Sequence, residues 1–294
     1  MTVTCIDNLQ TGSQRNIAPL LSHPRFTFLE HDVVTPLSDL RADLVFHLAS
    51  PASVVDYLNA PLQTIKVNSV GTMNLLEVAR RSDGRFLFTS TSEIYGDPQV
   101  HPQTESYWGN VNPIGPRACY DESKRLGEAT TFEYWRTCRT DTRVVRIFNT
   151  YGPHSRPDDG RIVPNFVIQA LKRQPITIYG DGSQTRSFCY VSDMVAGLLA
   201  AMLTEGTTGE VFNLGNPDEY TVLQFAEVIA RQLGSDAGIL YRPLPVDDPV
   251  RRRPDITKAR ERLGWEPTVD LHTGIARTAD WFRQVLDLPA PAAR

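Results

Sequence analysis

The 294-residue sequence has no apolar run of about 18 residues, the length needed to cross a bilayer. Its first residues lack a charged segment followed by an apolar one, so we expect no signal peptide. Basic residues cluster only at Arg251–Arg253, and the net charge is −4. These absences argue against a membrane or a nucleic acid as the main partner.

Cysteines are few, and their spacing matches no metal or redox motif. The four are Cys5, Cys119, Cys138 and Cys189, without a C-x-x-C pair, and the six histidines show no metal-ligand spacing. We therefore expect free thiols in a reducing, cytoplasmic compartment and no metal site. Hydrophobic residues make up 41% of the chain, which suffices for one or two globular domains.

Short apolar runs alternate with helical patterns in the first half of the chain. The runs predict strands at Val3–Ile6, Phe26–Leu29, Leu44–Leu48, Phe86–Phe88 and Val144–Phe148, and the periodic segments predict helices at Leu62–Arg80 and Tyr120–Arg136. This alternation predicts an α/β fold, a Rossmann-like doubly wound parallel sheet with helices on both faces.

After Gly152 glycine and proline become more frequent, which predicts a smaller mixed α/β domain. We expect strands at Ile176–Tyr179 and Phe188–Val191, and helices at Met194–Leu203, Val222–Leu233, Ile256–Leu263 and Leu271–Val285. The Pro/Ala-rich end, Leu288–Arg294, is expected to fray.

Tyr120 and Lys124 are the most informative pair in the chain. Four residues apart on a helix, they share one face. A nearby ammonium favours the phenolate and lowers the tyrosine pKa, which makes a base for an alcohol proton. Such a pair also occurs by chance on solvated helices. The hydroxyl-rich segment Thr89–Glu93 at a predicted strand end strengthens the catalytic interpretation.

Acids and small residues follow the predicted strands. Asp7 ends the first one, where a dinucleotide-binding fold carries an acid for the adenosine ribose, although Asp7-Asn8 also suits an ordinary turn. Asp32 ends the second strand and is a candidate to face an adenine. The third ends in HLASPAS (47–53), whose small residues suit the close approach of a ligand.

Seven motifs follow one another in order along the chain: TSTSEIYG (89–96), YWGNVNPIGPRACYDESKR (107–125), RIFNTYGP (146–153), DDGRIVPNF (158–166), YGDGSQTRSFCYVSD (179–193), NLGNPDEYT (213–221) and RRRPDITKARERLGWEP (251–267). Together they closely resemble those of the UDP-glucuronate decarboxylases, or UDP-xylose synthases, among the extended short-chain dehydrogenase/reductases. The resemblance extends from Val3 to about Leu286.

The resemblance implies a three-step cycle on UDP-glucuronate. Tyr120, with Thr91 nearby, takes the C4 hydroxyl proton while hydride passes to NAD. The resulting 4-keto acid loses CO2, and Glu93 holds water or a proton near C5. The hydride then returns to C4 and gives UDP-xylose. Arg252 matches the family's active-site arginine, which holds the substrate carboxylate.

The resemblance also assigns binding roles. It implies catalytic residues Thr91, Glu93, Tyr120, Lys124 and Arg252. It implies NAD-binding residues Asp7, Asn8, Thr11, Gly12, Asp32, Val33, Leu48, Ala49, Tyr120, Lys124 and Thr150. It implies substrate-binding residues Tyr57, Lys66, Ser92, Arg117, Asn149, Arg161, Thr177, Tyr179, Gln184 and Arg186.

Other interpretations of these residues stay open. Glu93 also suits a solvated strand end, Arg186 a simple ion pair, and Arg251–Arg253 a surface patch. Among enzymes, 4-epimerases and 4,6-dehydratases are the nearest rivals. A dehydratase of this superfamily would carry an Asp-Glu pair after the threonine, whereas Ser92 precedes Glu93 here.

The family's first strand, G-x-x-G-x-x-G turn and helix are missing from this sequence, whose first glycine is Gly12. That turn cradles the NAD pyrophosphate, and each lost hydrogen bond to a charged group costs roughly 1.5–3 kcal/mol. We expect a gap in the sheet and weakened NAD binding. A gene start about 25–30 residues upstream, the length of one strand–turn–helix unit, would explain the missing segment. Translating the in-frame DNA upstream tests this hypothesis. The alternative hypothesis is that the chain is a truncated relative without catalytic activity.

By resemblance, residues 1–149 and 186–215 are predicted to form the NAD-binding domain, and residues 150–185 and 216–294 the UDP-sugar-binding domain. The segments Leu62–Arg80 and Tyr120–Arg136 resemble the helices of a four-helix dimer interface in this superfamily. The resemblance therefore implies a homodimer.

Overall fold

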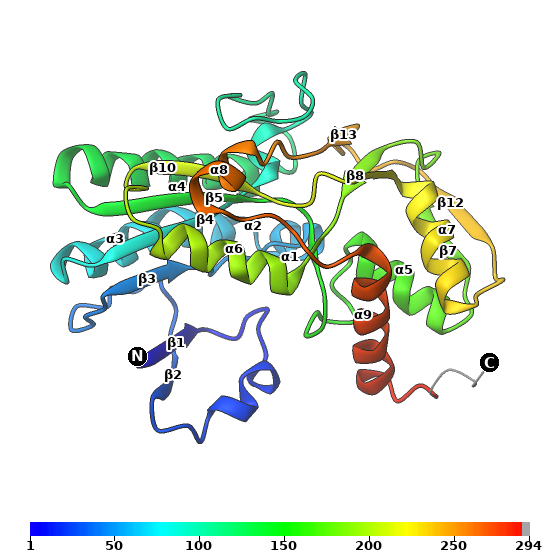
Figure 1. Ribbon diagram of the computed structural model, residues 1–294, viewed down its shortest axis with the longest axis horizontal. Coiled ribbons are helices and arrows are strands. Elements are labelled where there is room, and N and C mark those ends of the chain that lie inside the picture. Colours follow the sequence, from blue (N-terminus) through cyan, green and yellow to red (C-terminus); the bar gives the residue numbers. More distant parts are fainter. Residues whose placement is uncertain (290–294) are drawn as a thin grey trace.

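A four-stranded parallel sheet forms the centre of the N-terminal half of the chain (Figure 1). In the computed structural model, which describes residues 1–289, its strands are β3 (Leu44–His47), β4 (Arg85–Thr91), β5 (Asp141–Ile147) and β10 (Glu210–Leu214), in the order β10-β5-β4-β3. From residue 290 on, the tail predicted to fray lies outside the described residues.

Both faces of this sheet carry helices, as the doubly wound fold requires. Alternate side chains of β4 point to opposite faces: Phe86 and Phe88 join one apolar cluster, and Leu87 joins another. The first cluster packs under α3 (Thr72–Arg81) and α4 (Ala118–Cys138), and the second under α6 (Val191–Leu203). The predicted fold class is confirmed.

The helix predicted at Leu62–Arg80 consists of three continuous segments: α2 (Pro61–Lys66), a π-helical turn (Val67–Gly71) and α3. A short helix, α1 (Val54–Asn59), precedes it and is capped by the Ser53 side chain, which accepts from the Asp56 N–H. The next predicted helix is α4, which begins two residues before Tyr120 and ends where Arg139 adopts a left-handed φ of 59°.

The first two strands form a sheet of their own. β1 (Val3–Asp7) pairs in parallel with β2 (Phe26–Glu30), and two 3-10 turns, Gln14–Asn16 and Ala18–Leu20, lie between them. Among residues 1–289, no strand bridges β1 and β3. The predicted gap in the sheet is therefore present, and one ladder edge of β1 and one of β3 are unpaired.

The C-terminal half is mixed. Two-stranded sheets pair β6 (Thr150–Tyr151) with β9 (Cys189–Tyr190) and β7 (Ile176–Tyr179) with β12 (Ile239–Arg242). A three-stranded sheet has the order β11 (Glu219–Thr221), β8 (Thr185–Ser187) and β13 (Arg251–Arg252). Helices α5 (Ile162–Leu171), α7 (Val222–Leu233) and α9 (Leu271–Val285) share one apolar core, and α8 (Thr257–Leu263) packs beside β10.

Two local predictions need correction. The strand expected at Phe188–Val191 spans only Cys189–Tyr190, because Val191 already begins α6. Helix α5 was not predicted. Pro164 is its third residue, and a backbone N–H at this position would have no intrahelical partner, so the proline costs the helix no hydrogen bond. None of the helices within residues 1–289 is both long and apolar enough to span a bilayer.

Candidate active site

A cavity of about 420 Å³ lies beyond the carboxyl ends of β4 and β5, bounded on its other side by C-terminal segments. This is the edge at which parallel α/β sheets bind ligands. All five predicted catalytic residues line it. Nine further predicted residues do so as well: Ser92, Arg117, Asn149, Thr150, Arg161, Thr177, Tyr179, Gln184 and Arg186.

Glu93 lies in the short turn that follows β4. The Thr91 hydroxyl accepts from the Glu93 N–H at 3.2 Å and so starts this 3-10 turn, Ser92–Tyr95. The Glu93 carboxylate accepts from Arg117 Nη2 at 2.8 Å, and Arg252 Nη1 lies 3.7 Å from it. Burial by itself would raise the pKa of Glu93, but the two arginines outweigh burial and hold it at about 2. At neutral pH Glu93 is therefore a carboxylate.

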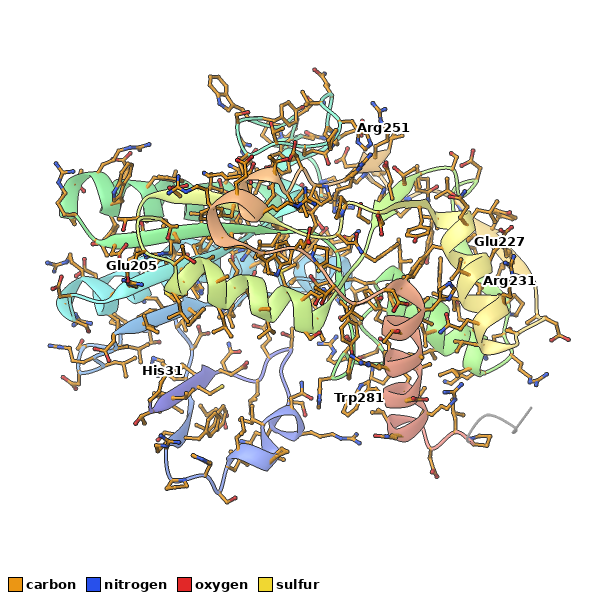
Figure 2. All side chains as sticks on the ribbon, in the orientation of Figure 1. His31, Glu205, Glu227, Arg231, Arg251 and Trp281 are labelled. Atoms are coloured by element: carbon orange, nitrogen blue, oxygen red, sulfur yellow. The ribbon has the colours of Figure 1, made fainter. Side chains whose placement is uncertain are left out.

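Arg252 retains hydrogen-bonding capacity. Its side chain is 5% exposed, and its Nε has no partner among the described residues. A buried guanidinium with a free N–H can take a second carboxylate. Of the three consecutive arginines only Arg252 is buried, whereas Arg251, labelled in Figure 2, is exposed.

Tyr120 and Lys124 lie on the inner face of α4, both buried. The Lys124 ammonium donates to the Thr89 carbonyl at 2.8 Å and lies 5.8 Å from the centre of the Tyr120 ring. Burial lowers the pKa of Lys124 to about 7.

The pKa of Tyr120 is raised above its ordinary value, because burial and the Glu93 charge outweigh a hydrogen bond from Thr91. The expectation that a nearby ammonium lowers the tyrosine pKa is therefore wrong.

Two predicted substrate residues do not line the cavity. Tyr57 lies behind Tyr120, with ring centres 4.9 Å apart and planes 7° from parallel, and its hydroxyl lies 3.5 Å from Glu93 Oε2. It therefore packs against two residues of the site without lining the cavity. Lys66 ends α2 and is exposed.

Asp248 links two of the arginines that line the cavity. It accepts from Arg186 Nη2 at 2.8 Å and from Arg117 Nη1 at 3.3 Å. Burial lowers the pKa of Arg186 to about 10, although Asp248 opposes that shift. Asp248 was not among the predicted site residues, and it lies in the irregular segment between β12 and β13. Its one signal is its place three residues before the arginine cluster.

The predicted adenosine-side residues lie outside this cavity, at the ends of β1, β2 and β3. Asp7 accepts from the Leu9 N–H at 2.7 Å, and a Cβ on Gly12 would come within 2.9 Å of the Asp7 carboxylate. Asp32 accepts from Asn8 at 3.2 Å and from Gln63 at 2.8 Å.

Three more residues predicted to bind NAD also lie outside this cavity, in or near the apolar cluster under α3 or on the surface. The Val33 side chain is buried in the apolar cluster under α3, and the Val33 carbonyl accepts from Asn74. Leu48 is 58% exposed, and Ala49 is half-buried beside that cluster.

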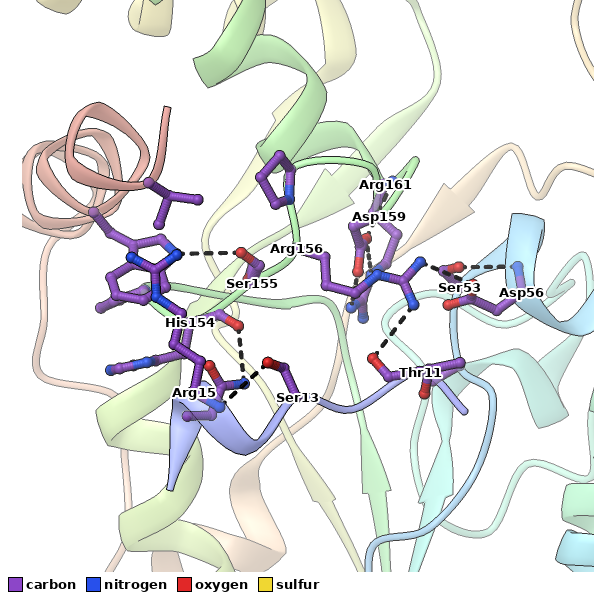
Figure 3. Close-up of a pocket in the computed structure, with 16 residues that line it drawn as sticks. Thr11, Ser13, Arg15, Ser53, Asp56, His154, Ser155, Arg156, Asp159 and Arg161 are labelled. Carbon is purple, nitrogen blue, oxygen red and sulfur yellow. Dashed lines mark hydrogen bonds and ion pairs between the residues drawn. The ribbon is translucent and has the colours of Figure 1, made fainter. Parts of the chain in front are cut away.

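Thr11 lines a second cavity of about 370 Å³, between the loop after β1, the 153–161 loop and α9 (Figure 3). Arg156 links its walls by donating to the Thr11 carbonyl at 3.3 Å and to Asp56 at 3.0 Å. Arg161, ion-paired with Asp159, lines both cavities, so the two adjoin. Arg156 was not among the predicted site residues.

The profile of one protein family, described as "NAD dependent epimerase/dehydratase family", matches residues 1–215. The chain belongs to that family. Among curated members, UDP-glucuronic acid decarboxylase 2 of Arabidopsis thaliana is 53% identical over 283 residues, 96% of this chain and 63% of the relative. The chain thus spans less than two thirds of that relative.

Two other curated UDP-glucuronic acid decarboxylases are similar to almost the whole chain. UDP-glucuronic acid decarboxylase 6 of Arabidopsis thaliana is 50% identical over 98% of this chain and 83% of its own length, and decarboxylase 1 of Xenopus tropicalis is 49% identical over 97% and 67%. Sequence similarity therefore groups this family member with the UDP-glucuronic acid decarboxylases, as predicted.

Solved structures of the family share the fold. The UDP-glucose 4-epimerase of Thermotoga maritima matches with a TM-score of 0.87 at 31% identity, over 97% of this chain and 92% of that one. UDP-glucuronic acid 4-epimerase of Bacillus cereus, crystallised with UDP-glucuronic acid and NAD, matches with 0.85 at 29% identity, over 97% and 91%.

Proposed function

We propose that this chain is an NAD-dependent decarboxylase that converts UDP-glucuronate to UDP-xylose. One arrangement carries the proposal: Glu93, fixed between Arg117 and Arg252, lines the same cavity as Tyr120 and Lys124. An alcohol-oxidising pair beside a buried guanidinium with a free N–H suits a sugar that bears both a hydroxyl and a carboxylate. Identity of 49–53% to UDP-glucuronic acid decarboxylases supports it.

The described residues fit the two ends of NAD. Asp7 would hold the adenosine ribose, since Gly12 leaves its carboxylate uncovered, and Thr150 and Lys124 would hold the nicotinamide end. The other proposed contacts are Asn8, Thr11, Asp32, Val33, Leu48, Ala49 and Tyr120. Residues 1–289 contain no glycine-rich cradle for the pyrophosphate. When bound, NAD+ would accept hydride from C4, return it to C4 after CO2 has left, and add a positive charge that favours the Tyr120 phenolate.

The chain's own residues would perform the acid–base steps. Tyr120 takes the C4 hydroxyl proton, with Thr91 hydrogen-bonded to it. Arg252 holds the substrate carboxylate until CO2 leaves, because the C4 ketone can accept the electrons of the broken C5–C6 bond. C5 then takes a proton near Glu93, and Tyr120 returns its proton to the C4 oxygen.

The rest of the cavity would hold the UDP-sugar. Arg186 and Arg161 supply positive charge for the diphosphate, and Tyr179, which is 47% exposed at the end of β7, is available to stack on the uracil. Arg117, Asn149, Ser92, Thr177 and Gln184 would complete the sugar and nucleotide contacts. Within this proposal, residues 1–149 and 186–215 serve NAD, and residues 150–185 and 216–294 serve the UDP-sugar.

The direct test incubates the purified chain with UDP-glucuronate, with and without added NAD+. We expect CO2 and a UDP-pentose, and neither from Tyr120→Phe. UDP-galacturonate without CO2 would instead identify a 4-epimerase, the alternative favoured by the similarity to the Bacillus cereus enzyme. Absence of any product with added NAD+, and of nucleotide in the purified protein, would identify a non-catalytic relative.

We also propose a cytoplasmic homodimer. The four cysteines are free thiols, which is typical of a reducing compartment. Helices α2 and α4 pack side by side and expose Leu62 (73%) and Leu126 (50%), with Ile65 and Met73 nearby along α2 and α3. An exposed apolar stripe on two adjacent helices suits burial against a second copy.

A further inference from the structure

Asp121 is a buried carboxyl group without a conventional partner. It follows Tyr120 on α4 and is 7% exposed. Its Oδ1 accepts no hydrogen bond from the N–H and O–H groups of residues 1–289, and no Lys or Arg in that range pairs with it. A carboxylate left in this position would be strongly unfavourable, since buried charges need a counter-ion or donors.

The Asp121 side chain instead forms a hydrogen bond with Glu93. Two carboxyl groups can hydrogen-bond to one another only when one of them carries a proton. Arg117 and Arg252 already stabilise Glu93 as the carboxylate, so the proton belongs to Asp121. Burial and the Glu93 charge accordingly raise the pKa of Asp121 to about 8.

We propose that Asp121 stores the proton that passes through Glu93 to C5 of the sugar after CO2 is lost. This inference rests on the proposed function. The C5–C6 bond breaks, CO2 leaves, and the electron pair moves toward the C4 ketone. Asp121 passes its proton to the Glu93 carboxylate, and Glu93 gives that proton to C5, so that a new C5–H bond forms and Glu93 is again a carboxylate. One proton from water restores Asp121, so each turnover takes up one proton and releases one CO2.

Glu93 connects Asp121 to the cavity, since Glu93 lines the cavity and hydrogen-bonds to Asp121, whereas Asp121 does not line it. The two arginines set the direction of the proton transfer. While both hold Glu93, the proton stays on Asp121. A substrate carboxylate bound to Arg252 would draw that guanidinium away from Glu93 and increase the proton affinity of Glu93. The stored proton would therefore move toward the cavity only when substrate is bound.

Other ionisable groups also face Asp121. They are Glu93, Arg117 and Arg252, together with Tyr57 on α1 and Cys119 and Tyr120 on its own helix. The arginines favour the ionised form of Asp121, whereas Glu93 and burial favour the protonated form and prevail. Proton storage should therefore fail as the pH rises above about 8.

Infrared spectroscopy of the ligand-free chain tests the stored proton independently of turnover. We expect a protonated-carboxyl C=O band at pH 7 that shifts in D2O and disappears in Asp121→Asn. Asn has nearly the same shape and can still donate to Glu93, so this variant should fold. Asp193→Asn is the matched control: buried Asp193 already accepts from Thr268 and Val269, so its replacement should leave the band intact. A band that persists in Asp121→Asn overturns the assignment.

Kinetics test delivery of the proton. For Asp121→Asn we expect kcat to fall about 100-fold with KM little changed, the loss of kcat at high pH to disappear, and Asp121→Glu to recover most of kcat. Unchanged kcat in Asp121→Asn, or loss explained by unfolding, overturns the delivery role. If the unaltered chain makes no UDP-pentose, delivery falls with the proposed function, while the infrared band still decides where the proton resides.

Discussion

Lys124 and Tyr120 show how burial acts on single residues. Burial lowers the pKa of the ammonium to about 7 and raises that of the phenol, so it favours the neutral form of both groups. The fold thus positions the pair but does not by itself ionise the tyrosine. A cation bound in the cavity would favour the Tyr120 phenolate.

Replacing Lys124 by Met should reveal the cost of burying the ammonium. Because the folded-state pKa of about 7 lies below the ordinary 10.5, the unfolded chain binds more protons between these values. The unaltered protein therefore gains stability as pH rises through this window. We expect the stability of Lys124→Met, relative to the unaltered chain, to fall between pH 7 and 10 in urea unfolding. A pH-independent difference would contradict the shift.

Arg252 is proposed to bind the substrate carboxylate, so its replacement should affect a ligand with a carboxylate more than one without. Lys cannot form the paired hydrogen bonds of a guanidinium, so Arg252→Lys should lower kcat/KM for UDP-glucuronate roughly 10–100-fold. The affinity for UDP, which has no carboxylate, should stay within about twofold. The exposed neighbour provides the control, because Arg251→Lys should change neither quantity. Equal losses for both ligands would show that Arg252 supports the fold instead.

At the scale of elements, α4 packs so closely on β4 that Gly127 has no space for a side chain. A Cβ at this position would lie 2.3 Å from Cζ of Phe88. Ala in an open helix position would gain about 0.5–1 kcal/mol over Gly, but overpacking a core costs about 1–3 kcal/mol. We expect Gly127→Ala to lower the free energy of unfolding by about 1–2 kcal/mol in urea titrations. Glu133→Ala, on the exposed side of α4, should be nearly neutral.

The separate β1–β2 sheet should exchange its amide hydrogens faster than the main sheet. Two strands alone are marginally stable, and Val3 and Leu29 are exposed there, whereas β4 and β5 are almost entirely buried. Hydrogen-exchange mass spectrometry on one sample compares the two regions directly. Equal protection of β1 and β5 would show that an additional contact stabilises the small sheet.

The sequence predicted well the elements whose signals are local. Helices α7 and α9 have the predicted bounds, because their apolar periodicity is regular and their capping residues are adjacent in sequence. The strand-end motif around Glu93 also indicated its place at the cavity. Helix α5 was missed because Pro164 resembles a loop signal, although proline is tolerated in a first helical turn.

Long-range pairings were not predictable from the sequence. Asp248 contacts an arginine 131 positions away, and Tyr57 stacks on Tyr120 from another helix. The pKa of Tyr120 depends on such distant neighbours and on burial, so a local Tyr–Lys spacing predicted its direction wrongly. Contacts of this kind depend on how finished elements pack, and a short motif carries no signal for them.

At the scale of the whole molecule, the exposed stripe on α2 and α4 should control assembly. Leu62→Asp combined with Leu126→Asp would place charges where the proposed dimer buries apolar side chains, so we expect a monomer at micromolar concentration. Light scattering after gel filtration measures the mass. Leu203→Asp, an equally exposed leucine on α6, should leave the dimer intact. A dimer in both variants would exclude this interface, and a monomer before mutation would exclude the homodimer.

Asp248 places a carboxylate of the chain itself between two arginines that line the cavity. It balances Arg117 and Arg186, two buried cations from distant parts of the chain, and so reduces the electrostatic repulsion between them. An incoming diphosphate would then exchange with this carboxylate, and the local charge balance would change less than if the arginines were bare. The affinity of the cavity for an anionic ligand should therefore depend on how readily the Asp248 carboxylate is displaced from the two arginines.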